Sequence, residues 1–115
     1  EDLLRAVVRV LDSKKARGIK VMRVADKTVI ADYFVMCTGT SNTQLRALSG
    51  ELEERLSEVG VYPGHIEGYN EANWIIMDYA SVIVHIFDRE TRSFYNLEKL
   101  WGDAEEIDVD SLLAD

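Results

Sequence analysis

The most constraining feature of the sequence is a pair of strand-like runs, Trp74–Tyr79 and Val82–Phe87, separated by only two residues. Two β-rich runs with so short a connection predict a tight antiparallel hairpin. If Tyr79 pairs with Val82, alternation places four aliphatic side chains together on one face, which is typical of a core. These side chains are Ile75, Met77, Val84 and Ile86.

The opposite face of the predicted hairpin is less uniform. A face that mixes a tryptophan, a histidine and an aspartate with aliphatic side chains is too polar for a sealed core and too apolar for plain solvent, which favours a protein interface. The alternative is that a helix covers this face and that His85 is a hydrogen-bonded core residue. Both interpretations fit the spacing. The facing pairs are Trp74 with Phe87, Ile76 with His85, and Asp78 with Ile83.

Periodicity also organises the segment that begins the chain. Leucine and valine residues recur at helical spacing and predict a helix from Leu3 to about Ala16, which Gly18 is placed to end. Ile19–Val24 and Tyr33–Thr38 then predict two strands joined by a polar turn.

A second helix is predicted directly after these strands. Ser41 and Gln44 have the three-residue spacing of a capping box, and Gly60 is placed to end the helix. Between them, apolar residues recur at helical spacing and predict one buried stripe. The stripe comprises Leu45, Leu48, Leu52, Leu56 and Val59.

The remaining elements complete a single α/β domain. His65–Glu67 predicts a short strand before the hairpin, and Phe94–Trp101 predicts a final helix that Gly102 ends. The predicted order is αββαβββα. This order indicates a mixed β-sheet of about five strands flanked by helices.

Negative charge is concentrated at the end of the chain. From Glu98 to Asp115 there are seven acidic residues and one basic residue, so this segment contributes −6 of the net charge of −8. Such a surface repels phosphate backbones and attracts basic proteins. The alternative, which we favour for the last dozen residues, is a solvated and partly disordered tail. We therefore predict a domain over residues 1–103 and an acidic tail over residues 104–115.

Residues that could support catalysis are isolated. The strand–turn–helix arrangement at Thr38–Asn42 could cradle a phosphate, but it lacks the GxGxxG spacing and the P-loop lysine. Asp78 has no second acid on either hairpin strand, so a two-metal site lacks its ligands. His65 and His85 lack metal-ligand spacing, and Cys37 lies in an apolar run typical of a buried thiol. We expect a binding protein and not an enzyme, with no catalytic, cofactor or metal site.

A series of motifs runs in order through most of the chain: Asp32–Ser41, Gln44, Gly68, Trp74–Tyr79, Val82–Phe87, Arg92, Phe94-Tyr95 and Leu97–Trp101. With the expected gaps from about Leu3 to Asp103, these motifs resemble the ribosomal silencing factor family, also called Iojap-like. In the hairpin turn, Ala80-Ser81 stands where the family often has a glycine and an acid. A type I′ turn needs positive φ at both positions, which alanine resists, so we expect another turn type or a longer turn.

The resemblance implies both a fold and a function. It implies a nucleotidyltransferase-like fold without catalytic carboxylates. It also implies a translational repressor that binds the large ribosomal subunit, chiefly its fourteenth ribosomal protein, and sterically blocks joining of the small subunit. A nucleotide-binding protein of the same fold and a homodimer that pairs through the aromatic face are the alternatives. No segment resembles a transit peptide, a signal peptide or a membrane span, so we expect a cytoplasmic bacterial protein that does not bind nucleic acid directly.

The resemblance and the hairpin alternation together suggest partner-binding residues. Tryptophan and tyrosine dominate interface hot spots, so aromatic side chains of the hairpin and the last helix are the first candidates. Leu97 and Trp101 have a spacing that equally suits packing against the sheet, and alternation places Tyr79 on the core face. The predicted residues are Trp74, Asp78, Tyr79, Tyr95, Leu97, Glu98 and Trp101.

Overall fold

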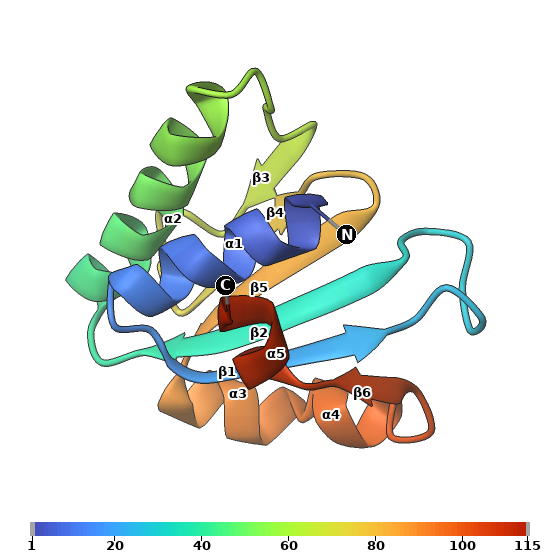
Figure 1. Ribbon diagram of the computed structural model, residues 1–115. Coiled ribbons are helices and arrows are strands. Elements are labelled where there is room, and N and C mark those ends of the chain that lie inside the picture. Colours follow the sequence, from blue (N-terminus) through green and yellow to red (C-terminus); the bar gives the residue numbers. More distant parts are fainter. Residues whose placement is uncertain (1, 115) are drawn as a thin grey trace.

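Within residues 2–114, which the computed structural model describes, six strands form one mixed sheet (Figure 1). The strands are β1 (Arg17–Arg23), β2 (Tyr33–Gly39), β3 (His65–Glu67), β4 (Trp74–Asp78), β5 (Val82–Asp88) and β6 (Glu105–Ile107). Their spatial order is β3-β4-β5-β2-β1-β6. β2 and β5 are parallel, and the other neighbouring strands are antiparallel. The predicted mixed α/β sheet is confirmed, with six strands instead of about five.

Helices cover the two faces of the sheet unequally (Figure 1). On one face, here called the near face, α1 (Asp2–Ser13) and α2 (Asn42–Ser57) pack with the short α5 (Val109–Leu113). Among the described residues, the opposite far face is crossed only by α3 (Arg89–Tyr95) and α4 (Leu97–Leu100). The molecule is therefore a helix–sheet–helix sandwich in which one helical layer is much smaller than the other.

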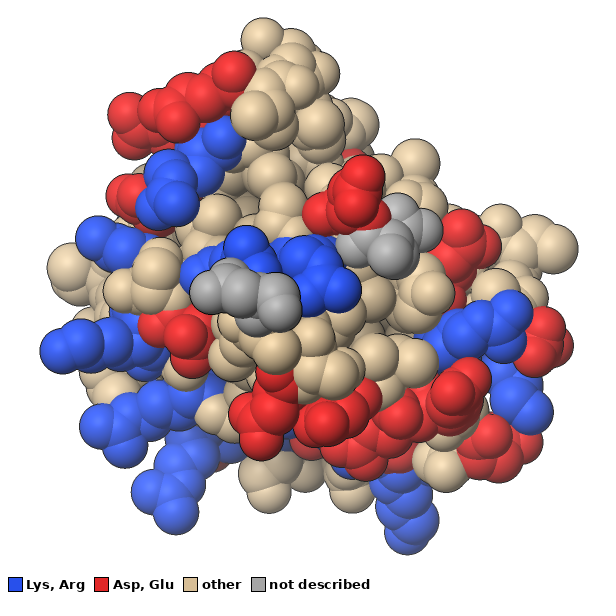
Figure 2. Space-filling view, in the orientation of Figure 1, with Lys and Arg blue, Asp and Glu red and all other residues tan. Residues whose placement is uncertain are grey.

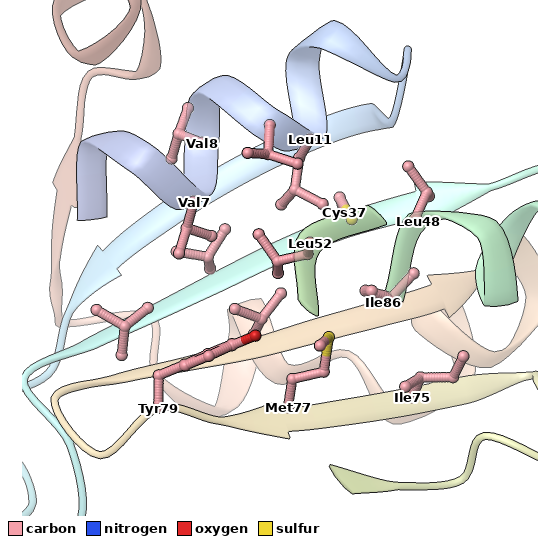
Figure 3. Close-up of a cluster of buried hydrophobic side chains, with 14 of the residues drawn as sticks. Val7, Val8, Leu11, Cys37, Leu48, Leu52, Ile75, Met77, Tyr79 and Ile86 are labelled. Carbon is pink, nitrogen blue, oxygen red and sulfur yellow. The ribbon is translucent and has the colours of Figure 1, made fainter. Parts of the chain in front are cut away.

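The near face is a sealed hydrophobic core. Ile75 pairs with Ile86 and Met77 with Val84, as the hairpin alternation predicts, and all four side chains are fully buried. Figure 3 shows side chains of α1, α2 and the strands converging between these elements, with Leu52 and Cys37 among them. The predicted core face of the hairpin is confirmed.

The predicted apolar stripe of α2 is confirmed except at its end. Its four leucines are buried, but the helix ends at Ser57 and the side chain of Val59 is exposed. Ser41 caps the helix, since its hydroxyl accepts a hydrogen bond from the Gln44 amide at 3.0 Å. The Gln44 side chain bonds Thr40 and not Ser41, with 2.8 Å between Gln44 Oε1 and Thr40 Oγ1, so the capping box is shifted by one residue.

Two other predicted helix boundaries are wrong. α1 stops at Ser13 because Lys15 adopts a left-handed φ of 63°, whereas Gly18 lies inside β1 at an irregularity of the ladder. The single helix predicted over Phe94–Trp101 is instead divided between α3 and α4 by Asn96, whose φ is 50°. Asparagine tolerates this left-handed conformation better than most residues.

The acidic end of the chain belongs to the sheet. β6 pairs with β1, and α5 packs on α1 with Leu112 buried. Arg5 of α1 donates a hydrogen bond from Nη1 to the Leu112 carbonyl oxygen at 2.9 Å. The prediction of a solvated, partly disordered tail is therefore wrong for residues 104–114, and residue 115 lies outside the described residues.

Candidate protein-docking surface

The far face combines a small buried cluster with aromatic side chains that remain accessible. α3 and α4 cover the cluster, but two aromatic side chains of α3 remain accessible: Phe94 is 79% exposed and Tyr95 is 52% exposed. The ring centroids of these two residues are 5.0 Å apart, and Tyr95 lies 4.8 Å from the ring of Trp74. We call Trp74, Phe94 and Tyr95 the aromatic surface. The buried cluster comprises Met22, Val24, Ala31, Phe34, Met36, Ile83 and Phe87.

The half-buried indole of Trp74 is held in one orientation. It stacks on Phe87 with ring centroids 5.1 Å apart, and its Nε1 donates a hydrogen bond to Nδ1 of His85 at 3.2 Å. Tyr95 contacts the ring from α3. Trp74 thus has fixed neighbours on β5 and α3 while part of its ring stays accessible, which is the arrangement of an interface anchor.

His85 is the polar support of this arrangement. Its side chain is only 6% exposed, and burial lowers its pKa to about 4. The imidazole is therefore neutral at physiological pH, with Nδ1 as the acceptor for Trp74 and the proton assigned to Nε2. Nε2 has no hydrogen-bond partner among residues 2–114. The alternative that His85 is a hydrogen-bonded core residue is confirmed, and Trp74 remains a candidate contact residue of this face.

Leu97 and Trp101 pack α4 and the residue that follows it against the far-face cluster. Both are partly buried against the far-face cluster, and the Trp101 ring meets Phe34 edge-on at 5.2 Å. The packing interpretation of these two residues is therefore the one that the structure supports.

Glu98 also has a structural partner. Its Oε2 lies 3.0 Å from Nε of Arg92, and Arg92 Nη1 donates to the hydroxyl of Thr38 at 2.9 Å and to the carbonyl oxygen of Gly18 at 2.7 Å. Arg92 thus ties the helices of the far face to β1 and β2. The sequence placed Arg92 in the family motif but offered no sign of this role.

Asp78 and Tyr79 lie away from the aromatic surface. Asp78 is at the opposite end of β4 from Trp74, and its Oδ1 accepts a hydrogen bond from the Ala80 amide at 2.8 Å. Ala80 has a φ of 69° and Ser81 has no positive φ, so the expectation that the turn is not type I′ is confirmed. Tyr79 is 6% exposed within the near-face core (Figure 3), where burial raises its pKa to about 12. The structure therefore contradicts Tyr79 as a contact residue.

An acidic rim borders the molecule along β6 and α5 (Figure 2). Lys27 donates to Asp103 Oδ2 at 3.2 Å, and this bond lowers the pKa of the Asp103 carboxyl. The other acids of the rim are exposed. The rim comprises Asp103, Glu105, Glu106, Asp108 and Asp110.

The described part of the chain shows no metal cluster. Residues 2–114 contain no group of three or more His, Cys, Asp or Glu side chains that could hold a metal ion. Cys37 is buried, and burial raises the pKa of its thiol to about 12. In the same residues, no helix has the length and apolar character needed to cross a membrane.

Comparison with known proteins assigns the chain to a family. A family model described as "Ribosomal silencing factor during starvation" matches residues 1–115. A protein of Halalkalibacterium halodurans named "Ribosomal silencing factor RsfS" is 36% identical, with 99% of this chain and 97% of that protein covered. The protein of the same name from Bacillus subtilis is 37% identical, covering 96% of this chain and 93% of that protein. A crystal structure from Chromobacterium violaceum, 28% identical, superposes with a TM-score of 0.85 over 88% of this chain and 84% of that one. The chain belongs to the ribosomal silencing factor family.

Proposed function

We propose that the protein represses translation by docking on the fourteenth ribosomal protein of the large subunit and preventing the small subunit from joining. The observation that carries this proposal is the aromatic surface, in which the accessible side chain of Trp74 on β4 lies beside those of Phe94 and Tyr95 on α3. Accessible aromatics with fixed neighbours lose little conformational entropy on binding, and they dominate interface hot spots.

A hollow beside these aromatics gives the surface relief. It has a volume of about 450 Å³ and is lined by Trp74, Phe94, Tyr95 and polar residues that include Asn73. A side chain of the ribosomal protein would fill this hollow and bury the Trp74 ring from its open side. Anchors that enter such depressions at the centre of an interface contribute most of its affinity.

Charge favours a basic partner. The acidic rim contributes five carboxylates, all from the part of the chain that follows α4. Opposite charges on the two partners would raise the association rate and restrict the orientation of docking. A basic ribosomal protein meets both the aromatic and the acidic features.

The size of the molecule suits a steric mechanism. The protein measures 34 × 33 × 26 Å. Atoms in direct hydrogen-bonded contact lie only about 3 Å apart, so a bound protein would hold the two subunits too far apart for such contacts. A body of this thickness on the intersubunit face would exclude the small subunit without any chemical step. Repression would then depend on occupancy and be reversed by dissociation.

Two assays on the same preparation test this proposal. The wild-type protein should co-sediment with isolated large subunits at near-physiological salt and reduce the yield of joined ribosomes. Trp74→Ala should weaken both effects together, because occupancy and blocking are the same event. Normal subunit joining at saturating wild-type protein would contradict the proposal, as would co-sedimentation that Trp74→Ala leaves unchanged.

A further inference from the structure

Basic side chains gather at one end of the molecule, away from the acidic rim. Figure 2 shows them at the left, over the end of α1 and the start of β1, while acidic side chains follow the lower right. Lys15 is exposed in the turn between α1 and β1, Arg17 is exposed at the start of β1, and Arg89 is exposed at the start of α3. We call Lys15, Arg17 and Arg89 the basic end.

Two residues of the basic end, Arg17 and Arg89, line a hollow at the carboxyl ends of the parallel strands β2 and β5. The hollow has a volume of about 700 Å³, and its lining includes Arg17, Arg89, Thr38 and Thr40. Crevices outside the carboxyl ends of parallel strands are common ligand positions in open α/β sheets. The two arginines thus face a space that an external group can enter.

Two carboxylates also line the hollow, and one of them, Asp88, is engaged in a hydrogen bond that stabilises α3. Asp88 caps α3, because its Oδ1 accepts a hydrogen bond from the Thr91 amide at 2.7 Å. Glu90 is exposed beside Arg89. With Lys15 next to the hollow in the chain, the exposed side chains at this end carry a positive excess.

The fold does not use the cations of the basic end. Among residues 2–114, the side chains of Lys15, Arg17 and Arg89 form no hydrogen bond or ion pair, whereas Arg46 and Arg92 bind backbone carbonyl oxygens. Arg89 lies in the first turn of α3, where the helix dipole disfavours a positive charge. Two of these free cations line the hollow, and Lys15 is two residues before Arg17 in the chain, so all three are available to a partner.

We propose that the basic end contacts the phosphodiester backbone of ribosomal RNA when the protein is docked on the large subunit; this inference rests on the proposed function. A net charge of −8 repels RNA from the molecule as a whole, so a contact with phosphates requires a local positive excess such as that of the basic end. Guanidinium groups suit this contact because their planar donors match phosphate oxygens. The contact revises the expectation of no direct nucleic-acid binding.

Phosphate contacts are identified by salt dependence. The triple variant Lys15→Gln, Arg17→Gln, Arg89→Gln should bind large subunits about tenfold more weakly at moderate salt. Its log affinity should also fall less steeply with log salt: the magnitude of the slope should decrease by about 2 to 3, roughly one for each phosphate contact. Its affinity for the isolated fourteenth ribosomal protein should equal that of the wild type, because no RNA is present.

A variant elsewhere on the surface controls for loss of positive charge. Arg23→Gln, Arg55→Gln removes two positive charges from exposed ion pairs outside the basic end and the acidic rim and should retain wild-type affinity and slope on large subunits. Wild-type slope in the basic-end variant would overturn the inference while leaving the proposed function standing. An equal loss of affinity for the isolated fourteenth ribosomal protein would also overturn the inference, because the cations would then contact that protein and not RNA. Failure of the wild type to bind large subunits would overturn both.

Discussion

The two faces of the sheet use apolar residues in different ways. On the near face, aliphatic side chains of α1, α2 and the strands pack until almost none is accessible. On the far face, two short helices cover only a small cluster, and the aromatic surface remains in contact with solvent. The difference teaches that one sheet can bury a core on one face and leave accessible aromatic side chains on the other, because its strands alternate side chains between the two faces.

The largest expected effect is on the near face. Leu52→Ala removes a fully buried side chain and should lower the free energy of unfolding by about 2 to 5 kcal/mol, because a cavity remains. Leu100→Ala makes the same change at an exposed position of α4 and should stay within about 0.5 kcal/mol. Denaturant unfolding of both variants measures the contrast, and equal losses would show that the far face is also core.

The second prediction concerns the acid sensitivity of the far face. Since burial lowers the pKa of His85 from 6.5 to about 4, the unfolded state binds the proton first as the pH falls. The neutral imidazole therefore stabilises the fold above pH 6.5, and this contribution is lost as the pH falls toward 4, by about 3 kcal/mol.

His85→Gln should remove this pH-dependent contribution. The difference in free energy of unfolding between wild type and variant should shrink by that amount between pH 7 and pH 4. Leu100→Ala, an exposed position of α4 where the change removes no titratable group, is the control and should differ from the wild type by a constant amount. A wild-type minus His85→Gln difference that stays constant with pH would contradict the burial of a neutral imidazole.

The smallest expected effect on stability is that of Tyr79→Phe, which tests whether Tyr79 belongs to the near-face core or to the contact surface. Its hydroxyl is buried without a hydrogen-bond partner among the described residues, so Tyr79→Phe should change stability by less than about 1 kcal/mol, toward greater stability. Co-sedimentation with large subunits should be unchanged. Weaker binding by this variant would return Tyr79 to the contact surface.

The sequence predicts the hairpin well because its constraints are local. Two residues between strands and strict alternation fix which side chains share a face, so the register of Ile75 with Ile86 follows directly. The acidic end of the chain could not be predicted in this way. Leu112 is buried by packing on α1, more than 100 residues earlier in the chain, and acidic composition conceals that contact.

The same contrast between local and long-range constraints applies to the candidate site. Alternation in the hairpin predicts the face on which Trp74 lies, but its contact with Tyr95 depends on α3 crossing the far face. The break at Asn96, where one residue adopts a left-handed conformation, turns α4 so that Leu97 packs inward. Helical spacing alone predicted a continuous helix and did not show that Phe94 would be left exposed.

The most direct measurement compares two exposed tyrosines in large-subunit binding. Tyr95 belongs to the aromatic surface and is 52% exposed, whereas Tyr62 precedes β3 and is 68% exposed. Tyr95→Ala should weaken binding by about 2 kcal/mol, or roughly 30-fold, and Tyr62→Ala should bind as the wild type does. Equal affinity of the two variants, or a larger loss for Tyr62→Ala, would contradict docking through the far face.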